Sequence, residues 1–176
     1  MNSNQDLTGL RLIAHPLRLR ILSLLTGQSM SAAEVARQLD ETQANISYHL
    51  RRLADGGLLR LVDEQKVRGG IAKRYTHDSA SAERFATSST GEMRQLLTLL
   101  AQEMVRRGDA YRAGSTHAFT DAQVLVTVDA RDRLEEVARD LGRQVHDAAA
   151  SASASAETAP RVPISVTVAL FEMISR

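Results

Sequence analysis

Apolar residues recur at helical spacing through the first part of the chain and predict a series of short helices there. Residues 8–26 are the first helical segment, which is interrupted at His15 and Pro16. Because proline is tolerated in the first turn of a helix, we expect Pro16 to begin a second helix rather than end the segment. Gly27 is expected to close that helix. Its apolar face is made by Leu17, Ile21, Leu24 and Leu25.

Two further short helices are predicted next, joined by a tight turn. Ser31 precedes Glu34 at the spacing of a capping box, which marks a helix N-terminus. The helix that follows covers residues 42–55 and is ended by Gly56 and Gly57. Two short helices joined in this way are the outline of a helix-turn-helix.

A β-hairpin is predicted directly after the second short helix. Residues 59–62 have the composition of a strand, Gly69 and Gly70 signal a turn, and residues 72–76 can return as the second strand. Four basic residues lie near the tip and on the return strand: Lys66, Arg68, Lys73 and Arg74.

A longer amphipathic helix is predicted at residues 90–111, after a short helix at 79–87. A broad apolar stripe of this kind needs a partner surface, either in the same chain or in a second copy of it. We therefore expect it to supply core and dimer interface. The stripe consists of Met93, Leu96, Leu97, Leu100, Met104 and Val105.

The rest of the chain has the pattern of a strand, a helix and a strand. Residues 123–129 alternate as a strand does, residues 130–148 have one apolar face, and residues 163–171 form a second strand pattern. The low-complexity run at residues 148–160 is predicted to be a loop or a frayed helix end. Since two strands alone are marginal in water, they are expected to pack on helices or to pair with a second subunit.

The helix at 42–55 has an outward face of unusual composition. At about 100° per residue, Ile46, Leu50 and Leu53 fall within about 60° of each other and face the core. The remaining residues point in different directions around the helix axis. Ala44 and Tyr48 point directly away from the core, Arg51 and Arg52 lie to either side of that direction, and Asn45, Ser47 and His49 lie further round, with Gln43 in the first turn.

Such a face suits DNA. The major groove of B-DNA admits a helix of this size, and amide side chains can bind adenine edges while arginine serves guanine or phosphate. In helix-turn-helix proteins the first residues of the recognition helix touch the bases. Gln43, Ala44, Asn45 and Ser47 occupy that end here, and the basic hairpin could contact the flanking backbone.

The sequence resembles a known family over roughly residues 10–77. AHPLRLRILSLL, then AAEVARQLDETQANISYHLRRLADGGLLR, then a basic hairpin ending in KRY, is similar to the winged helix-turn-helix repressors of the ArsR family, and most of all to a cysteine-free actinobacterial branch with an added C-terminal region. The resemblance implies a dimeric transcription regulator, usually a repressor. It also implies that Gln43, Asn45, Ser47 and His49 lie at the DNA side.

The expected fold class is therefore α+β, with a mainly helical winged helix-turn-helix domain followed by a dimerisation helix and a small strand–helix–strand region. Residues 1–78 are expected to form the DNA-binding domain. Residues 79–176 are expected to supply dimerisation through Met93, Leu96, Leu97, Leu100 and Met104, and to provide an effector region if one exists.

Charge and cysteine content narrow the function further. Residues 1–77 carry 11 Lys and Arg against 7 Asp and Glu, a net charge of +4, whereas residues 78–176 have a net charge of −3. A basic N-terminal half fits an anionic partner. The chain has no cysteine, so disulfides, thiolate metal sites and the thiolate sensing of metal-responsive relatives are excluded.

No leader or membrane segment is predicted, so we expect a cytoplasmic protein. No apolar run reaches the roughly 18 residues that a membrane helix requires, and the first ten residues lack the basic and apolar regions of a signal peptide.

No catalytic motif is present either. The chain lacks a phosphate-binding glycine loop, a G-x-S-x-G elbow and an H-E-x-x-H pair, so we expect no enzyme and no cofactor. The five histidines show no metal-ligand spacing, although Asp109 with His117, or His146 with Asp147, stays an alternative for Zn or Ni. A small-molecule effector in an apolar pocket is also left open.

Two functions from different classes follow. The first is a sequence-specific regulator, expected to be a repressor, that binds a pseudopalindromic operator in double-stranded DNA as a homodimer. The second is a winged-helix protein-interaction module whose acidic C-terminal half binds a protein partner. Salt separates them, because DNA affinity falls steeply with salt as phosphate contacts release counterions.

Overall fold

Side-chain caps set the boundaries of the helices in the N-terminal half. The computed structural model describes residues 10–67, 70–84, 89–154 and 160–173. Its first helices are α1 (Leu10–Ile13), α2 (Pro16–Leu24), α3 (Ala32–Leu39) and α4 (Gln43–Asp55). The break at His15 and Pro16 is confirmed, and His15 caps α2 because its Nδ1 accepts a hydrogen bond from the backbone N–H of Leu17 at 3.2 Å.

The caps of α3 and α4 are those that the sequence predicts. Ser31 and Glu34 form a reciprocal capping box at the start of α3. The hydroxyl of Thr42 accepts a hydrogen bond from the backbone N–H of Asn45 at 3.2 Å and so caps α4. Gly56 caps the C-terminus of α4, and Gly57 follows with a φ of 72°, a conformation that favours glycine.

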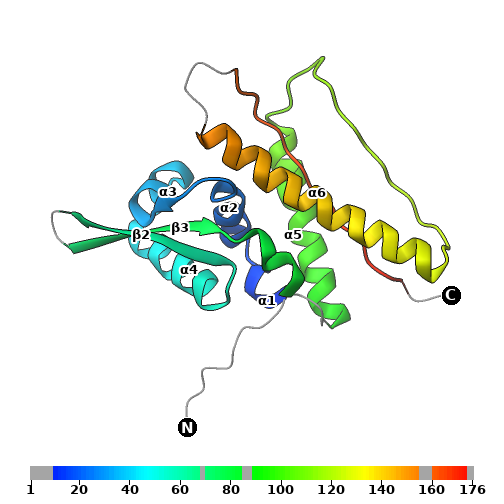
Figure 1. The fold of residues 1–176 in the computed structure, drawn as a ribbon, viewed down its shortest axis with the longest axis horizontal. Coiled ribbons are helices and arrows are strands. Elements are labelled where there is room, and N and C mark those ends of the chain that lie inside the picture. The colour runs from blue at the N-terminus through cyan, green and yellow to red at the C-terminus, as the bar shows by residue number, and fades with distance from the viewer. Residues whose placement is uncertain (1–9, 68–69, 85–88, 155–159, 174–176) are drawn as a thin grey trace, which may run out of the picture.

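The sheet is an antiparallel hairpin with a short third strand. It has the order β1-β3-β2, from β1 (Met30–Ser31), β2 (Leu59–Val67) and β3 (Gly70–His77). The hairpin register pairs Leu59 with His77 and Lys66 with Ile71, and the hairpin projects beyond α3 and α4 as a wing (Figure 1). β1 was not predicted, because two residues are too short to carry a sequence pattern.

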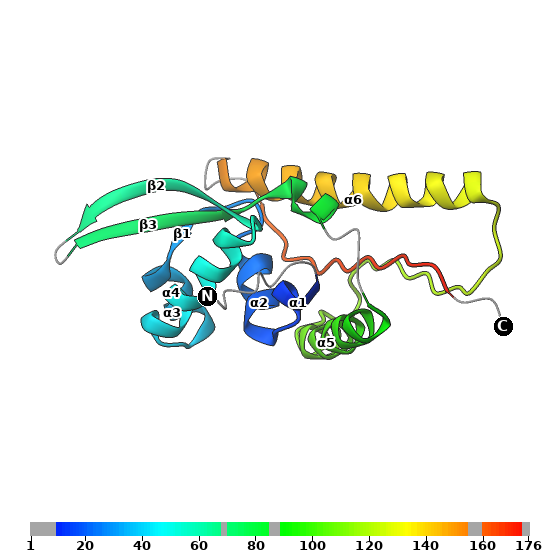
Figure 2. The same ribbon diagram turned by 90° about the horizontal axis from the view of Figure 1, so that it is seen from below.

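The core lies inside the N-terminal half. Its largest fully buried side chains come from α2 and its C-cap, from α3, from α4 and from the turn after α4: Ile21, Leu25, Val35, Ile46, Leu50, Leu53 and Leu58. Burying each such side chain contributes roughly 1.5–3 kcal/mol. Figure 2 shows α2 between the α3–α4 pair and α5, which lets α2 support the helix-turn-helix on one side and the C-terminal half on the other.

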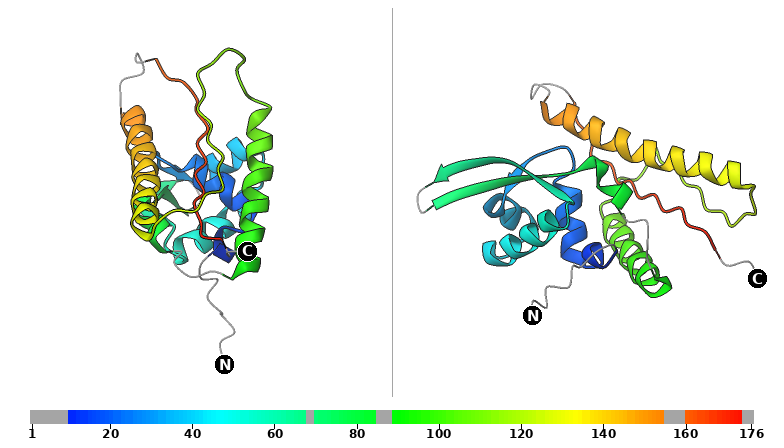
Figure 3. Two further views of the ribbon diagram at one scale, coloured as in Figure 1. Left: turned by 90° about the vertical axis from the view of Figure 1, so that its right-hand side faces the viewer. Right: turned by 60° about the horizontal axis from the view of Figure 1, so that its bottom comes forward.

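Two long helices dominate the C-terminal half. A 3-10 helix, η1 (Ser79–Arg84), precedes α5 (Thr90–Gly108), which begins with a second capping box, and α6 (Val128–Ala154) follows. Two extended segments run between α5 and α6, one leading into α6 and the other formed by residues 160–173 (Figures 2 and 3). The predicted helix at 90–111 therefore ends at Gly108, one turn early.

The predictions of strands at 123–129 and 163–171 were wrong. Residues 123–127 have no regular structure, α6 already begins at Val128, and residues 163–171 are extended without belonging to a strand. Alternating apolar positions favour an extended backbone, but a strand also needs a hydrogen-bonded neighbour. The prediction for residues 130–148 was too short, because alanine and serine continue α6 to Ala154.

The second half of α6 packs against the base of the wing. The ring of His146 lies 4.7 Å from that of His77 at the end of β3. Gly27, with a φ of 76°, sits so close to α6 that a Cβ there would lie 2.3 Å from the Cβ of Ala149. Only glycine allows this approach, so Gly27 has a packing role. The C-cap of α2 is Leu25, two residues before the glycine that the sequence predicts there.

Candidate nucleic-acid interface

The outward face of α4 is exposed and polar at its N-terminal end. Gln43 and Ala44 are exposed, Tyr48 is 53% exposed, and Asn45 and Ser47 are partly exposed. On the opposite side Ile46, Leu50 and Leu53 are buried, as the sequence predicts. The fold therefore holds the helix so that its first two turns can enter a groove.

Local hydrogen bonds orient two side chains of this face. The side-chain amide of Asn45 donates to Glu41 Oε2 at 3.0 Å, and Nε of Arg51 donates to the backbone carbonyl of Ser47 at 3.2 Å. Both contacts are at the surface, where a DNA base or phosphate can replace them at little cost.

His49 lies elsewhere than the resemblance implies. Its side chain is only 7% exposed, and its ring lies 4.7 Å from that of His15 and 5.2 Å from that of Tyr48. It therefore sits between α4 and the start of α2 rather than on the outward face.

The wing contributes exposed lysines. Lys66 is exposed on β2, and Nζ of Lys73 on β3 lies 3.2 Å from a carboxylate oxygen of Glu64 across the hairpin. Since both partners are well exposed, this ion pair contributes about 0–1 kcal/mol and can be given up on binding an anion. Arg68 lies outside the described residues.

Arg74 has partners inside the domain. Its guanidinium lies 2.7 Å from Glu34 Oε2 and donates to the backbone carbonyl of Ser29 at 2.6 Å. Hydrogen bonds from Ser31, followed by Arg74, lower the pKa of Glu34 to about 2. Arg74 thus fastens the wing to the start of α3 in this structure, a role that its place in a basic run did not reveal.

Sequence reasoning did not place two residues beside α4, and it predicted Arg18 to be a surface charge. His15 and Arg18, at the start of α2, lie against the flank of α4 that carries His49 and Arg52. Burial first, and then the charge of Arg52, lowers the pKa of Arg18, while burial and Arg18 lower that of His15. Their distance from residues 42–55 in the sequence meant that no spacing could connect them.

The apolar stripe of α5 is only partly covered within the chain. Leu96 is buried, Met93, Leu97 and Leu100 are partly buried, and Met104 and Val105 are 51% and 73% exposed. Within the chain, α5 packs against α1.

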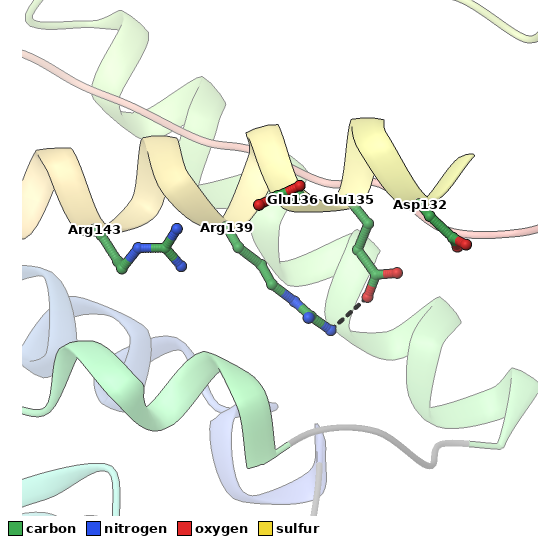
Figure 4. A pocket seen from close by; sticks show the side chains of 5 residues that line it. All are labelled: Asp132, Glu135, Glu136, Arg139 and Arg143. Carbon is green, nitrogen blue, oxygen red and sulfur yellow. Dashed lines mark hydrogen bonds and ion pairs between the residues drawn. The ribbon is translucent and has the colours of Figure 1, made fainter. Parts of the chain in front are cut away.

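The hollow in Figure 4 differs from the apolar effector pocket that was left open. It is lined by charged side chains of α6 alone, with an ion pair of 2.5 Å between Arg139 and Glu135. Effector pockets are mostly apolar and draw on several elements. We therefore regard it as a solvated helix face.

Among the described residues, no three His, Asp or Glu side chains gather closely enough to hold a metal ion. Within that same part of the chain, none of the helices combines the length and apolar character needed to span a bilayer.

One family model matches the chain. Residues 13–62, from the end of α1 into β2, match the family described as a helix-turn-helix domain. No curated protein sequence matches.

Solved structures similar to this chain include regulators from several organisms. Reduced HlyU from Vibrio cholerae N16961 is 24% identical, with 55% of this chain and 82% of that chain covered at a TM-score of 0.35. An ArsR-like transcriptional regulator from Rhodococcus sp. RHA1 is 26% identical (56% and 81% covered, TM-score 0.33). A protein with a GntR superfamily winged-helix-turn-helix domain from Halomicrobium mukohataei is 20% identical (73% and 78% covered, TM-score 0.36). Because these TM-scores are low, the likenesses carry no argument of their own.

The matched helices and the hairpin that follows them define the class of protein. A helix-turn-helix with a β-hairpin directly after its second helix is a winged helix-turn-helix, and the chain is a DNA-binding transcription regulator of that class. More narrowly, the match over residues 13–62 agrees with the helix-turn-helix that the sequence predicts at residues 31–55.

Proposed function

We propose that this protein is a sequence-specific repressor that binds a pseudopalindromic operator as a homodimer. In this proposal, residues 1–78 bind DNA and residues 79–176 hold the dimer together. Repression results from occupying DNA that the transcription machinery needs.

The observation that carries the proposal is the exposed N-terminal face of α4 beside a basic wing. Gln43, Asn45 and Ser47 offer amide and hydroxyl groups to base edges, and Ala44 lets the helix approach closely. Arg51 lies beside this face and Lys66 on the wing, where each can bind a phosphate. The face of α4 and the wing could thus supply both base contacts and backbone contacts.

The homodimer is supported by apolar surface in the C-terminal half. Monomers rarely expose large apolar areas, and a second copy can cover them through an isologous interface. The exposed apolar residues of the helices and extended segments include Met104, Val105, Leu134, Val137, Leu141, Val124, Leu125, Ile164 and Phe171. The extended segments could also pair their backbones with those of the second subunit.

Two-fold symmetry makes the proposal testable by footprinting. Hydroxyl-radical cleavage of the bound operator should show two protected half-sites about one helical turn apart, related by a dyad. A single protected half-site would contradict the dimeric reading. Uniform protection along the duplex would contradict sequence-specific binding.

The experiment also separates the alternative function. If the winged helix were a protein-interaction module, no duplex would be protected, and a packed apolar interface with a protein would change little with salt.

A further inference from the structure

We propose that His15 and Arg18 of the α1–α2 region, together with His49 and Arg52 of α4, form a binding site for one backbone phosphate of the DNA. This inference rests on the proposed DNA binding and adds α2 to the interface. It assigns a ligand class, a phosphodiester, to a side-chain cluster outside the outward face of α4.

Two arginines and two histidines from two elements converge at this place, and the arginines supply its positive charge. α2 packs against α4, and the rings of His15 and His49 lie 4.7 Å apart at 45°. The charge of Arg52 acts on Arg18, and the charge of Arg18 acts on both histidines. Like charges held together raise the local potential and attract an anion.

Two polar atoms of the cluster lack a hydrogen-bond partner. In the described part of the chain, Nε of Arg52 and Nδ1 of His49 are buried and have no hydrogen-bond partner. A buried polar atom without a hydrogen-bond partner is unfavourable, so such atoms in a native protein are few and indicate a missing partner. A phosphate oxygen accepts hydrogen bonds from guanidinium and from an imidazole N–H, so in this proposal small movements of Arg52 and His49 on binding let it satisfy both.

Arg52 lies on α4 where a backbone contact is expected. At about 100° per residue, Arg52 lies about 120° from the buried direction of Ile46, on the flank of α4 that faces α2. The exposed Tyr48 lies next to this flank, on the outward face. A helix in the major groove has phosphates along both of its flanks, so the cluster borders the groove as a backbone contact should.

Among the described residues, the carboxylate of Glu41 acts on His49. Glu41 raises the pKa of His49, against the larger effects of burial, His15 and Arg18, which lower it. Its carboxylate accepts a hydrogen bond from the Asn45 side chain at 3.0 Å, so its charge is directed toward the start of α4. Arg18 and Arg52 add two guanidinium charges to the cluster, which favours an anion over a metal ion as its ligand.

The test compares Arg18→Gln with Arg20→Gln in the full-length protein. Both variants lose one positive charge from α2, but Arg20 lines a different hollow, beside Glu103 and Arg106 of α5. Binding of a fluorescent duplex is measured from low to near-physiological salt. Arg18→Gln should lower the slope of log K against log salt by about 1 for each subunit bound, and should weaken native and scrambled duplexes alike. Arg20→Gln should keep the parent slope.

The outcomes separate this inference from the proposed function. If the parent protein binds no duplex, the proposed function fails. If the parent binds but Arg18→Gln keeps its salt slope, as Arg20→Gln does, the phosphate site is overturned. Should Arg18→Gln fail to fold, Arg18→Lys replaces it: a phosphate site predicts a normal slope with weaker binding, because lysine keeps the charge and loses the bidentate fork.

A second arm distinguishes DNA from a free anion. Inorganic phosphate is titrated into the parent protein while the ring protons of His15 and His49 are followed by NMR. A response to inorganic phosphate with an unchanged salt slope in Arg18→Gln would make this a small-anion site and contradict the DNA contact. A reduced slope supports the DNA contact whether or not free phosphate binds.

Discussion

Residues close in the sequence have different roles where the wing meets the helices. Lys73 is exposed and its ion pair with Glu64 lies at the surface, whereas the neighbouring Arg74 is held by Glu34 and Ser29. His77 ends the same strand with its ring inside the domain. The wing is thus basic toward solvent and fastened to the domain at its base.

Ser47 and Arg51 test the recognition helix at the level of single side chains. Ser47→Ala and Arg51→Ala should each weaken operator binding or relax its sequence preference, by about 1–3 kcal/mol for a base contact. Both side chains lie at the surface of α4, so the melting temperature should stay near that of the parent. Binding is measured against the native and single-base-changed duplexes. Parent-like affinity and specificity in both variants would show that the recognition helix is misassigned.

His77 makes the stability of the fold depend on pH. Burial, and then His146, lower its pKa to about 4, against a smaller raising effect of Asp78. The hydroxyl of Thr26 donates a hydrogen bond to the carbonyl of Leu22, so its oxygen can only accept from Nδ1–H of His77. The other ring nitrogen, Nε2, then has no proton and accepts a hydrogen bond from the Ser81 hydroxyl.

The unfolded chain binds a proton near the ordinary histidine pKa of about 6.5, whereas folded His77 resists protonation until about pH 4. The contribution of His77 is therefore complete above about pH 6.5 and lost as pH falls toward 4, on the order of 2 kcal/mol. Urea unfolding of the parent and of His77→Gln across this window measures it. The variant should lose less stability than the parent as pH falls; parallel curves would contradict the assignment.

Among the elements, α6 packs against the N-terminal half at Gly27. Gly27→Ala should destabilise the protein for two reasons, the positive φ of 76° and the collision with Ala149. Gly114→Ala is the matched control, because Gly114 has a φ of 77° with open space around it. The control should cost about 1 kcal/mol through strain alone. Urea unfolding that gives equal losses for both variants would show that α6 does not pack on Gly27.

A helix or strand could be predicted from the sequence when the residues that define it contact each other within a few positions. Ser31 with Glu34, Thr42, and Gly56 with Gly57 set the limits of α3 and α4 through contacts within a few residues, so sequence alone located them. The alternating residues of 163–171 carry no such local signal, since a strand is decided by a neighbouring backbone. The cluster of His15 with His49 was missed for the same reason, as only the packing of α2 on α4 brings these residues together.

In the whole molecule, the two halves of the chain differ in net charge and in how many apolar side chains they bury. The N-terminal half holds nearly all of the buried apolar side chains and a net positive charge, while the C-terminal half exposes many apolar ones. This distribution fits a DNA-binding part that folds around its own core and a second part that is completed by another subunit.

The proposed dimer predicts the effect of a charge on α5. Met104→Glu places a carboxylate on the exposed part of the apolar stripe and should shift the protein from dimer toward monomer in sedimentation equilibrium. Gln102→Glu adds the same charge to a different face of α5 and should leave the dimer intact. A parent protein that is already monomeric at micromolar concentration would contradict the proposal, as would a Met104→Glu dimer of parent stability.

The central claim, that α4 and the wing bind DNA in a sequence-specific way, is tested most directly by fluorescence anisotropy. The protein is titrated into the duplex upstream of its own gene and into a scrambled duplex of the same composition, at low and near-physiological salt. We expect a strong preference for the native duplex that persists as salt rises, above a weaker, salt-sensitive binding to both duplexes. Absence of binding to either duplex at both salt concentrations would contradict it.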